Sequence, residues 1–279
     1  MRIVNLIENT EGVKGCAYAH GLSFYVETET HRLLVDLGPS EETLSNAQTL
    51  GVDLTKIDTV ILSHGHYDHS GGILPFTKIN GHAAIYMQKT APAAYYADDG
   101  ESGNAGRYRY IGIDEKIADL PQVRLLEGDH TIDDALSLFV IERRADKLPF
   151  SNARLKRMTG DAYVQDTFDH EHFLVIRNGQ SRILISGCAH NGILNILKEY
   201  QRKYGAEPDA VISGFHFMKK SEYIPEEIRE IEDTAKALQL YDTVFYTCHC
   251  TGIPAFDVMK RILGDQLHYV HAGEAITLP

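Results

Sequence analysis

Residues 57–72 read IDTVILSHGHYDHSGG, and this stretch decides the fold. Its first half is rich in β-branched and aliphatic residues, which predicts a buried strand. Its second half gathers four side chains that can bind a metal, namely His64, His66, Asp68 and His69. Imidazole and carboxylate groups are common ligands of zinc and similar metals. A strand end would hold the first ligand rigidly, and Gly65 would let the loop curl until the side chains converge.

Around this stretch the chain alternates short strand patterns with helix patterns, and no linker interrupts it. We expect strands at residues 2–7, 22–28, 31–38, 57–64, 83–88, 123–128, 137–142, 172–177, 182–187, 209–216, 243–250 and within 267–278. We expect helices at 40–52, 191–205, 225–240 and 254–263, and one that starts near residue 71 and is broken by Pro75. This alternation predicts one layered α/β domain over residues 1–279.

Two segments depart from this alternation. Residues 90–115 are rich in Ala, Tyr, Asp and Gly, and we interpret them as an irregular insertion or a mobile cap. Residues 143–165 contain the most basic stretch of the chain. Loops of such length are usually functional or disordered, so we expect both segments to be insertions outside the regular framework.

The composition limits the function classes. The 279 residues are 43% hydrophobic and 24% charged, which is ordinary for a globular protein. The net charge of −12 argues against general nucleic-acid binding, because an acidic surface repels phosphate backbones. No apolar run approaches the ~20 residues that a membrane span requires. The opening MRIVNLIENT lacks the pattern of a signal peptide, and four cysteines are too few for a disulfide scaffold, so we expect a cytoplasmic protein.

The string LSHGHYDHSGG resembles the HxHxDH signature of the metallo-β-lactamase superfamily. LLVDLG at 33–38 resembles an early strand of that superfamily, which ends in an Asp. The resemblance extends to one branch, which contains an archaeal 7,8-dihydropterin-6-methyl-4-(β-D-ribofuranosyl)aminobenzene-5′-phosphate synthase and many uncharacterised hydrolase-like proteins. The stretches similar to that branch are HGLSFYVE (20–27), SGCAHNGILNI (186–196), SGFH (213–216) and CHCTG (248–252).

The resemblance implies a four-layer αββα sandwich with one or two divalent metal ions at one edge. Zinc is the metal we expect, with iron and manganese as alternatives, because His and Asp ligands suit all three. The implied ligands are His64, His66, Asp68, His69, His190 and His249. Asp36 is implied to support the metal loop from behind.

Several residues keep two interpretations open. Cys188 stands where many members carry a bridging Asp, so it is either a thiolate ligand or a small buried hydrophobic residue. His216 is a ligand, a substrate contact or a proton shuttle. Cys248 and Cys250 are expected to point away from His249, because side chains alternate along a strand. His170 and His172 are weaker candidates for a third ligand, which the sequence otherwise leaves unassigned.

The basic segment suggests how a substrate is recognised. Arg154 and Arg157 are candidates for binding a phosphate or carboxylate, because guanidinium groups bind oxyanions in a bidentate manner. A solvated charged loop is the alternative. His20 either reaches the site or is hydrogen-bonded in its loop. The same choice applies to four tyrosines, which would stack on a flat ring or pack within the cap: Tyr95, Tyr96, Tyr108 and Tyr110.

These observations predict a hydrolase that uses a metal-bound hydroxide on a small anionic substrate. Asp68 would accept a hydrogen bond from the attacking water, and His216 would be the general acid. The alternative is a transferase that condenses a dihydropterin with a ribofuranosylaminobenzene phosphate. We expect a small-molecule substrate as partner, no nucleic acid and no membrane, and the oligomeric state stays open. A di-iron oxidoreductase and a non-catalytic binding protein are less consistent with the length and the intact motif.

Overall fold

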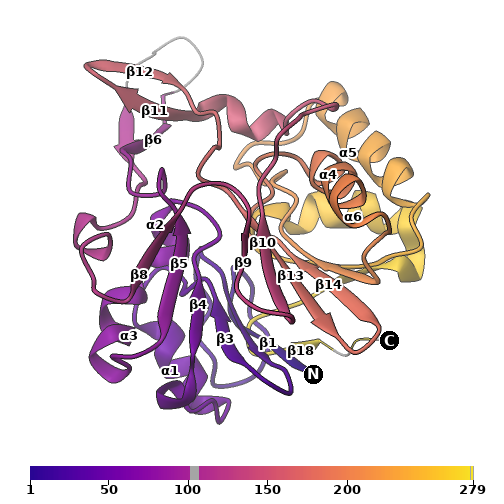
Figure 1. Ribbon diagram of the computed structural model, residues 1–279. Coiled ribbons are helices and arrows are strands. Elements are labelled where there is room, and N and C mark those ends of the chain that lie inside the picture. Colours follow the sequence, from indigo (N-terminus) through magenta and orange to yellow (C-terminus); the bar gives the residue numbers. More distant parts are fainter. Residues whose placement is uncertain (101–106, 277, 279) are drawn as a thin grey trace.

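The computed structural model describes residues 1–100, 107–276 and 278. Within these residues two seven-stranded sheets face each other across a shared core (Figure 1). The first sheet has the order β18 (Ala275–Ile276), β1 (Arg2–Ile7), β2 (Ser23–Glu27), β3 (Arg32–Val35), β4 (Thr59–Ile61), β5 (Ala84–Gln88) and β8 (Val123–Leu126). The second has the order β17 (Leu267–Tyr269), β16 (Val244–Thr247), β15 (Ala210–Ile212), β14 (Ser181–Ile185), β13 (Phe173–Asn178), β10 (Leu136–Phe139) and β9 (His130–Thr131).

Helices cover the outer face of each sheet. The first sheet carries α1 (Glu42–Thr49), α2 (Tyr67–Ser70) and α3 (Ile73–Ile79), and the second carries α4 (Ile193–Tyr204), α5 (Pro225–Leu238) and α6 (Ile253–Leu263). The four layers are therefore helix, sheet, sheet and helix. This arrangement confirms the predicted sandwich. No helix in the described part of the chain is long and apolar enough to cross a membrane.

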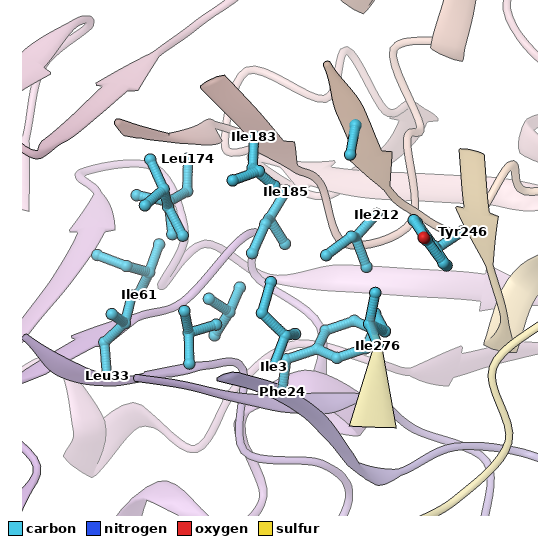
Figure 2. Close-up of a cluster of buried hydrophobic side chains, with 14 of the residues drawn as sticks. Ile3, Phe24, Leu33, Ile61, Leu174, Ile183, Ile185, Ile212, Tyr246 and Ile276 are labelled. Carbon is cyan, nitrogen blue, oxygen red and sulfur yellow. The ribbon is translucent and has the colours of Figure 1, made fainter. Parts of the chain in front are cut away.

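Strand alternation divides the apolar side chains between the layers. In β3, Leu33 and Val35 face the second sheet, whereas Leu34 faces the helices. Figure 2 shows the layer between the sheets, where Ile3 and Phe24 lie opposite residues such as Ile185. Burial of this apolar surface is the main force that holds the sheets together, at roughly 25 cal/mol per Å². Three buried clusters thus stack across the sandwich, one between the sheets and one under each helical layer.

A third sheet forms a cap at one end of the sandwich (Figure 1). It has the order β12 (Ala162–Gln165), β11 (Leu155–Thr159), β6 (Tyr95–Asp98) and β7 (Tyr108–Tyr110) among the described residues. The two predicted insertions therefore pair with each other, since Leu155 lies opposite Ala97. The prediction that residues 90–115 are irregular is wrong for the described part, because these strands depend on a partner about 60 residues away. Residues 101–106 of that prediction lie outside the described residues.

Pro75 does not break its helix, contrary to the prediction. Helix α3 begins at Ile73 and continues to Ile79, so Pro75 falls in the first turn. The first four N–H groups of a helix have no acceptor within the helix, and proline therefore removes no bond there.

Candidate metal centre and its cleft

The histidine-rich stretch leaves β4 and turns into α2, as its strand-then-loop pattern predicts. His64 and His69 are completely buried, and His66 and Asp68 are nearly so. The turn passes very close to Ala91, since a Cβ on Gly65 would lie 2.3 Å from the Ala91 carbonyl oxygen. Glycine is therefore required at this position.

Three histidines form the first of two clusters, which we call the histidine cluster: His64, His66 and His190. Each contributes one ring nitrogen to a group in which all three lie within 4.8 Å of one another. The Nε2 atoms of all three are buried and have no hydrogen-bond partner among the described residues. A buried nitrogen without a partner carries a desolvation cost, which a bound metal ion would offset. The donor set therefore fits a divalent metal.

Two histidines of this cluster, His64 and His190, are held at their other ring nitrogen. Nδ1 of His64 lies 2.9 Å from Oγ of Ser63, and Nδ1 of His190 lies 3.0 Å from Oδ1 of Asn152. Such partners fix ring orientation and leave the opposite nitrogen free for a metal. Asn152 could not be recognised from the sequence, because it comes from the basic segment, 38 residues before His190.

The second cluster, which we call the mixed cluster, contains Asp68, His69 and His249. The Nε2 atoms of the two histidines are 3.2 Å apart. Oδ2 of Asp68 lies 3.5 Å from Nε2 of His249 and 3.7 Å from Nε2 of His69. Asp36 and Asn9 hold Nδ1 of His69 and His249 at 2.6 and 2.8 Å. Three potential ligands thus converge here, each histidine with its own polar support.

The two clusters differ in their electrostatics. Burial, together with neighbouring histidines, lowers the pKa of His66 to about 3 and the pKa of His64 and His190 well below its usual range. Burial alone would lower the pKa of His69 as well, but Asp36 and Asp68 raise it to about 9. These surroundings favour the neutral rings of the histidine cluster, which can donate lone pairs to a metal, whereas Asp36 and Asp68 favour the charged form of His69.

Two cysteines lie at the mixed cluster. Sγ of Cys188 is 3.2 Å from Nε2 of His69, and Cys250 belongs to a group with Cys188 and His249 within 4.8 Å. The prediction that Cys250 points away from His249 is wrong. The strand β16 ends at Thr247, and a 3₁₀ turn over His249–Thr251 replaces its alternation. Cys248 does lie in the core between the sheets.

His170 offers no free nitrogen to the clusters, and His172 belongs to neither cluster, although its Nε2 is buried without a hydrogen-bond partner among the described residues. Nδ1 of His170 accepts the N–H of Gly65 at 3.0 Å, and its Nε2 lies 3.1 Å from Asp166. His170 therefore shapes the metal loop. Nδ1 of His172 lies 3.2 Å from the side-chain amide of Gln88.

A cleft of about 290 Å³ opens onto both clusters. His216 lines it, and its ring centroid lies 4.1 Å from that of His190. Nδ1 of His216 is buried without a partner among the described residues. His20 also lines the cleft, with Nε2 3.4 Å from Oδ2 of Asp68. Partial burial together with His249 and His69 lowers the pKa of His20 to about 4, although Asp68 acts to raise it.

The two arginines predicted to bind substrate, Arg154 and Arg157, have different surroundings in the structure. Arg154 lines the cleft, where it pairs with Asp99 at 2.5 Å. Arg109 lines it too, and the same Asp99 holds its Nε at 2.7 Å. Sequence reasoning missed Arg109, because it lies in the segment that was expected to be irregular. Arg157 pairs with Asp169 and is not among the residues that line the cleft.

The tyrosines of the cap contact one another. The ring of Tyr96 packs edge-on against Tyr110 and Tyr163, and Tyr108 stacks on Tyr163. None of these four lines the cleft. Tyr95 is completely buried and packs on His170, so the packing interpretation holds for all of these positions.

Several residues around the site adopt a left-handed backbone conformation. Every described non-glycine residue with positive φ lies beside the clusters, outside the strands and α-helices: Asp36, Phe168, Ala189, His216 and His249. The ring of Phe168 stacks on His190 at 4.9 Å. Each such conformation costs on the order of 1–3 kcal/mol, and it persists only where surrounding contacts fix it. One such contact is the buried carboxylate of Glu171, which accepts the backbone N–H groups of His190 and Asn191.

A family model described as the metallo-β-lactamase superfamily matches residues 19–144. A crystal structure described as a metal-dependent hydrolase of the β-lactamase superfamily superposes with a TM-score of 0.81 at 28% identity, over 100% of this chain and 99% of that one. The chain contains a metallo-β-lactamase domain. The resemblance inferred from the histidine motif is thereby confirmed. Metallo-β-lactamase proteins are generally enzymes that act on small molecules, and their fold suggests divalent metal binding.

Two relatives from Methanocaldococcus jannaschii extend the likeness over nearly the whole chain. An uncharacterised protein is 29% identical over 279 residues, which cover 97% of this chain and 98% of the relative. The 7,8-dihydropterin-6-methyl-4-(β-D-ribofuranosyl)aminobenzene-5′-phosphate synthase is 29% identical over 296 residues, which cover 99% of this chain and 96% of the synthase. The metallo-β-lactamase-fold protein YhfI of Bacillus subtilis shares the fold, with a TM-score of 0.57 at 16% identity.

Proposed function

We propose that this metallo-β-lactamase-fold chain is a metal-dependent hydrolase of a small anionic substrate. The observation that carries the proposal is the convergence of three buried, partnerless Nε2 atoms, those of His64, His66 and His190, beside a cleft lined by two of these histidines and by Asp68. In the proposal these histidines hold one divalent ion, and Asp68, His69 and His249 hold a second. A bound metal of this kind lowers the pKa of water and polarises a carbonyl or phosphoryl oxygen.

Asp68 and His216 carry the proton chemistry in this proposal. The mixed cluster holds the pKa of Asp68 well below its usual range, although burial alone would raise it, so the side chain is a carboxylate at neutral pH. A carboxylate beside the cleft accepts a hydrogen bond and so orients the attacking water. His216 lines the cleft beside His190, with its Nδ1 unpartnered among the described residues, and it donates a proton to the leaving group.

Arg109 and Arg154 give the cleft its preference for anions. Both side chains line it, and Asp99 holds both in place from one side. Guanidinium groups fixed in this way present their remaining N–H donors to phosphate or carboxylate oxygens. A negative substrate is therefore favoured at the rim, in a protein whose net charge is −12.

A transferase that forms the product named for the archaeal synthase is the second candidate. The near full-length similarity to that synthase favours it. The size of the cleft favours the hydrolase, because about 290 Å³ is at the small end of ligand pockets and the joined product carries a pterin, a benzene ring and a ribose phosphate. The cap tyrosines, which could have stacked on a pterin, pack on one another instead.

One set of assays separates the two functions. The zinc-loaded protein is incubated with phosphodiesters, phosphomonoesters, thioesters and esters, and separately with the two halves of the synthase product. Hydrolysis of an anionic ester, reduced by roughly 10²–10⁴-fold in His216→Gln at unchanged metal content, supports the proposal. Formation of the joined product, detected by mass spectrometry without hydrolysis of any ester, supports the transferase instead.

A further inference from the structure

Cys188 lies between the two clusters. Its Sγ is 3.2 Å from Nε2 of His69. The same sulfur belongs to three groups of potential ligands, each within 4.8 Å: one with His64 and His69, one with His190 and His216, and one with His249 and Cys250. An atom common to all three groups occupies the place of a bridging ligand.

Cys250 also lies beside the mixed cluster, in a group with Cys188 and His249. Its sulfur is 3.4 Å from the carbonyl oxygen of Cys188, and it lines the same cleft. Gly214 leaves the space it fills, because a Cβ at that position would lie 2.3 Å from Sγ. The sulfur is therefore held at a fixed point within reach of His249.

Cys248 shows what a cysteine used only for packing looks like in this chain. It is two residues from Cys250 and is completely buried among the aliphatic side chains between the sheets. The groups that Cys188 forms with His64 and His69, with His190 and His216, and with His249 and Cys250 do not include Cys248. Packing alone therefore explains Cys248, but it does not explain two sulfurs directed at imidazole nitrogens.

We propose that Cys188 and Cys250 are thiolate ligands of the metal centre, with Cys188 shared between the two metal positions and Cys250 bound to the second alone. The proposal rests on the proposed function, because it assumes that both clusters hold metal. Each thiol loses its proton to water as a metal–sulfur bond forms, and no group is oxidised or reduced. Thiolate donors are soft, so the second position selects zinc, cobalt or cadmium over manganese and magnesium.

Cobalt(II) tests this directly, because cobalt–thiolate bonds produce an intense near-ultraviolet charge-transfer absorption that histidine and carboxylate ligands do not. The full chain is freed of metal and titrated with cobalt(II), with absorbance and bound cobalt recorded together. The variants are Cys250→Ser, Cys188→Ser and Cys188→Asp, and the control is Cys16→Ser, a half-buried cysteine outside both clusters.

We expect the wild type and Cys16→Ser to show the band at two bound cobalt ions. Cys250→Ser should lose about one third of it and Cys188→Ser about two thirds, since they remove one and two of three cobalt–sulfur contacts. Cys188→Asp should keep two metal ions with the same loss of absorbance as Cys188→Ser.

Two cobalt ions bound without the band would overturn the thiolate assignment and leave the proposed function intact. A full band in Cys250→Ser would overturn the role of Cys250. Absence of cobalt binding in the wild type would contradict the proposed function itself. If a variant fails to fold, the wild type alone still tests the proposal. Bound cobalt must then protect Cys188 and Cys250, but not Cys16, from alkylation, which is mapped by mass spectrometry.

Discussion

Oδ2 of Asp36 lies 2.6 Å from Nδ1 of His69, and both side chains are completely buried. The same carboxylate accepts the backbone N–H of Ser63 at 2.8 Å and its hydroxyl at 2.7 Å. Since Oγ of Ser63 also lies 2.9 Å from Nδ1 of His64, one carboxylate orients a histidine of each cluster. Asp36 is thus a positioning residue for both halves of the site.

Asp36→Asn should weaken metal binding at both positions by roughly 10–100-fold, because it replaces a charged acceptor behind His69 by a neutral amide. The measurement is a zinc competition titration against a chromophoric chelator. Asp161→Asn is the control, because Asp161 is exposed in the turn between β11 and β12. Equal affinities for Asp36→Asn and the wild type would contradict the positioning role.

His190→Ala should remove one of two bound metal ions, since it deletes one of three nitrogen donors from the histidine cluster. Elemental analysis of protein purified without added metal gives the count. His82→Ala is the control, because His82 is exposed and outside both clusters. Retention of both ions in His190→Ala would show that this cluster binds no metal through His190.

Much of the framework could be predicted because its signals are local. The strands of the sandwich follow from runs of alternating apolar residues, and residues 57–72 identify the superfamily. The structure also brings His190 and His249 beside the histidine-rich loop, because each follows a strand that ends at the same edge of the sandwich.

What the sequence could not predict depends on distant partners or on backbone shape. The cap strands pair across about 60 residues of chain, so neither segment alone carries the pattern. Cys250 faces the cleft because His249, directly before it, adopts a left-handed backbone conformation with φ of 51°. The alternation of side chains along β16 therefore does not continue to Cys250. Asn9 and Asn152 support histidines far away in sequence, and a single asparagine in a loop gives no sign of such a role.

Arg154→Met should raise KM for an anionic substrate about tenfold or more, because a charge-assisted hydrogen bond contributes about 1.5–3 kcal/mol. Steady-state rates on para-nitrophenyl phosphodiester and on the neutral para-nitrophenyl acetate provide the comparison, and only the first should change. Arg157→Met is a matched control, since Arg157 pairs with Asp169 and does not line the cleft. An equal loss with both substrates, or an equal loss in both variants, would contradict anion recognition by Arg154.

His31 joins the two sheets through two carboxylates. Its Nδ1 lies 2.9 Å from Asp58, before β4, and its Nε2 lies 2.5 Å from Asp133, in the turn between β9 and β10. Burial alone would lower the pKa of His31, but the two carboxylates raise it above its ordinary value of about 6.5. The folded chain therefore binds this proton more tightly than the unfolded chain does.

The stabilisation from His31 should accordingly be complete below about pH 6.5 and disappear as the pH rises through the higher pKa of the folded state. We expect His31→Gln to lower the free energy of unfolding by about 1 kcal/mol or less at pH 5.5, because partly exposed ion pairs contribute little. The difference from the wild type should shrink by pH 9 in urea unfolding experiments. His82→Gln should show no such dependence. A difference that grows with pH would reverse the sign and refute a raised pKa for His31.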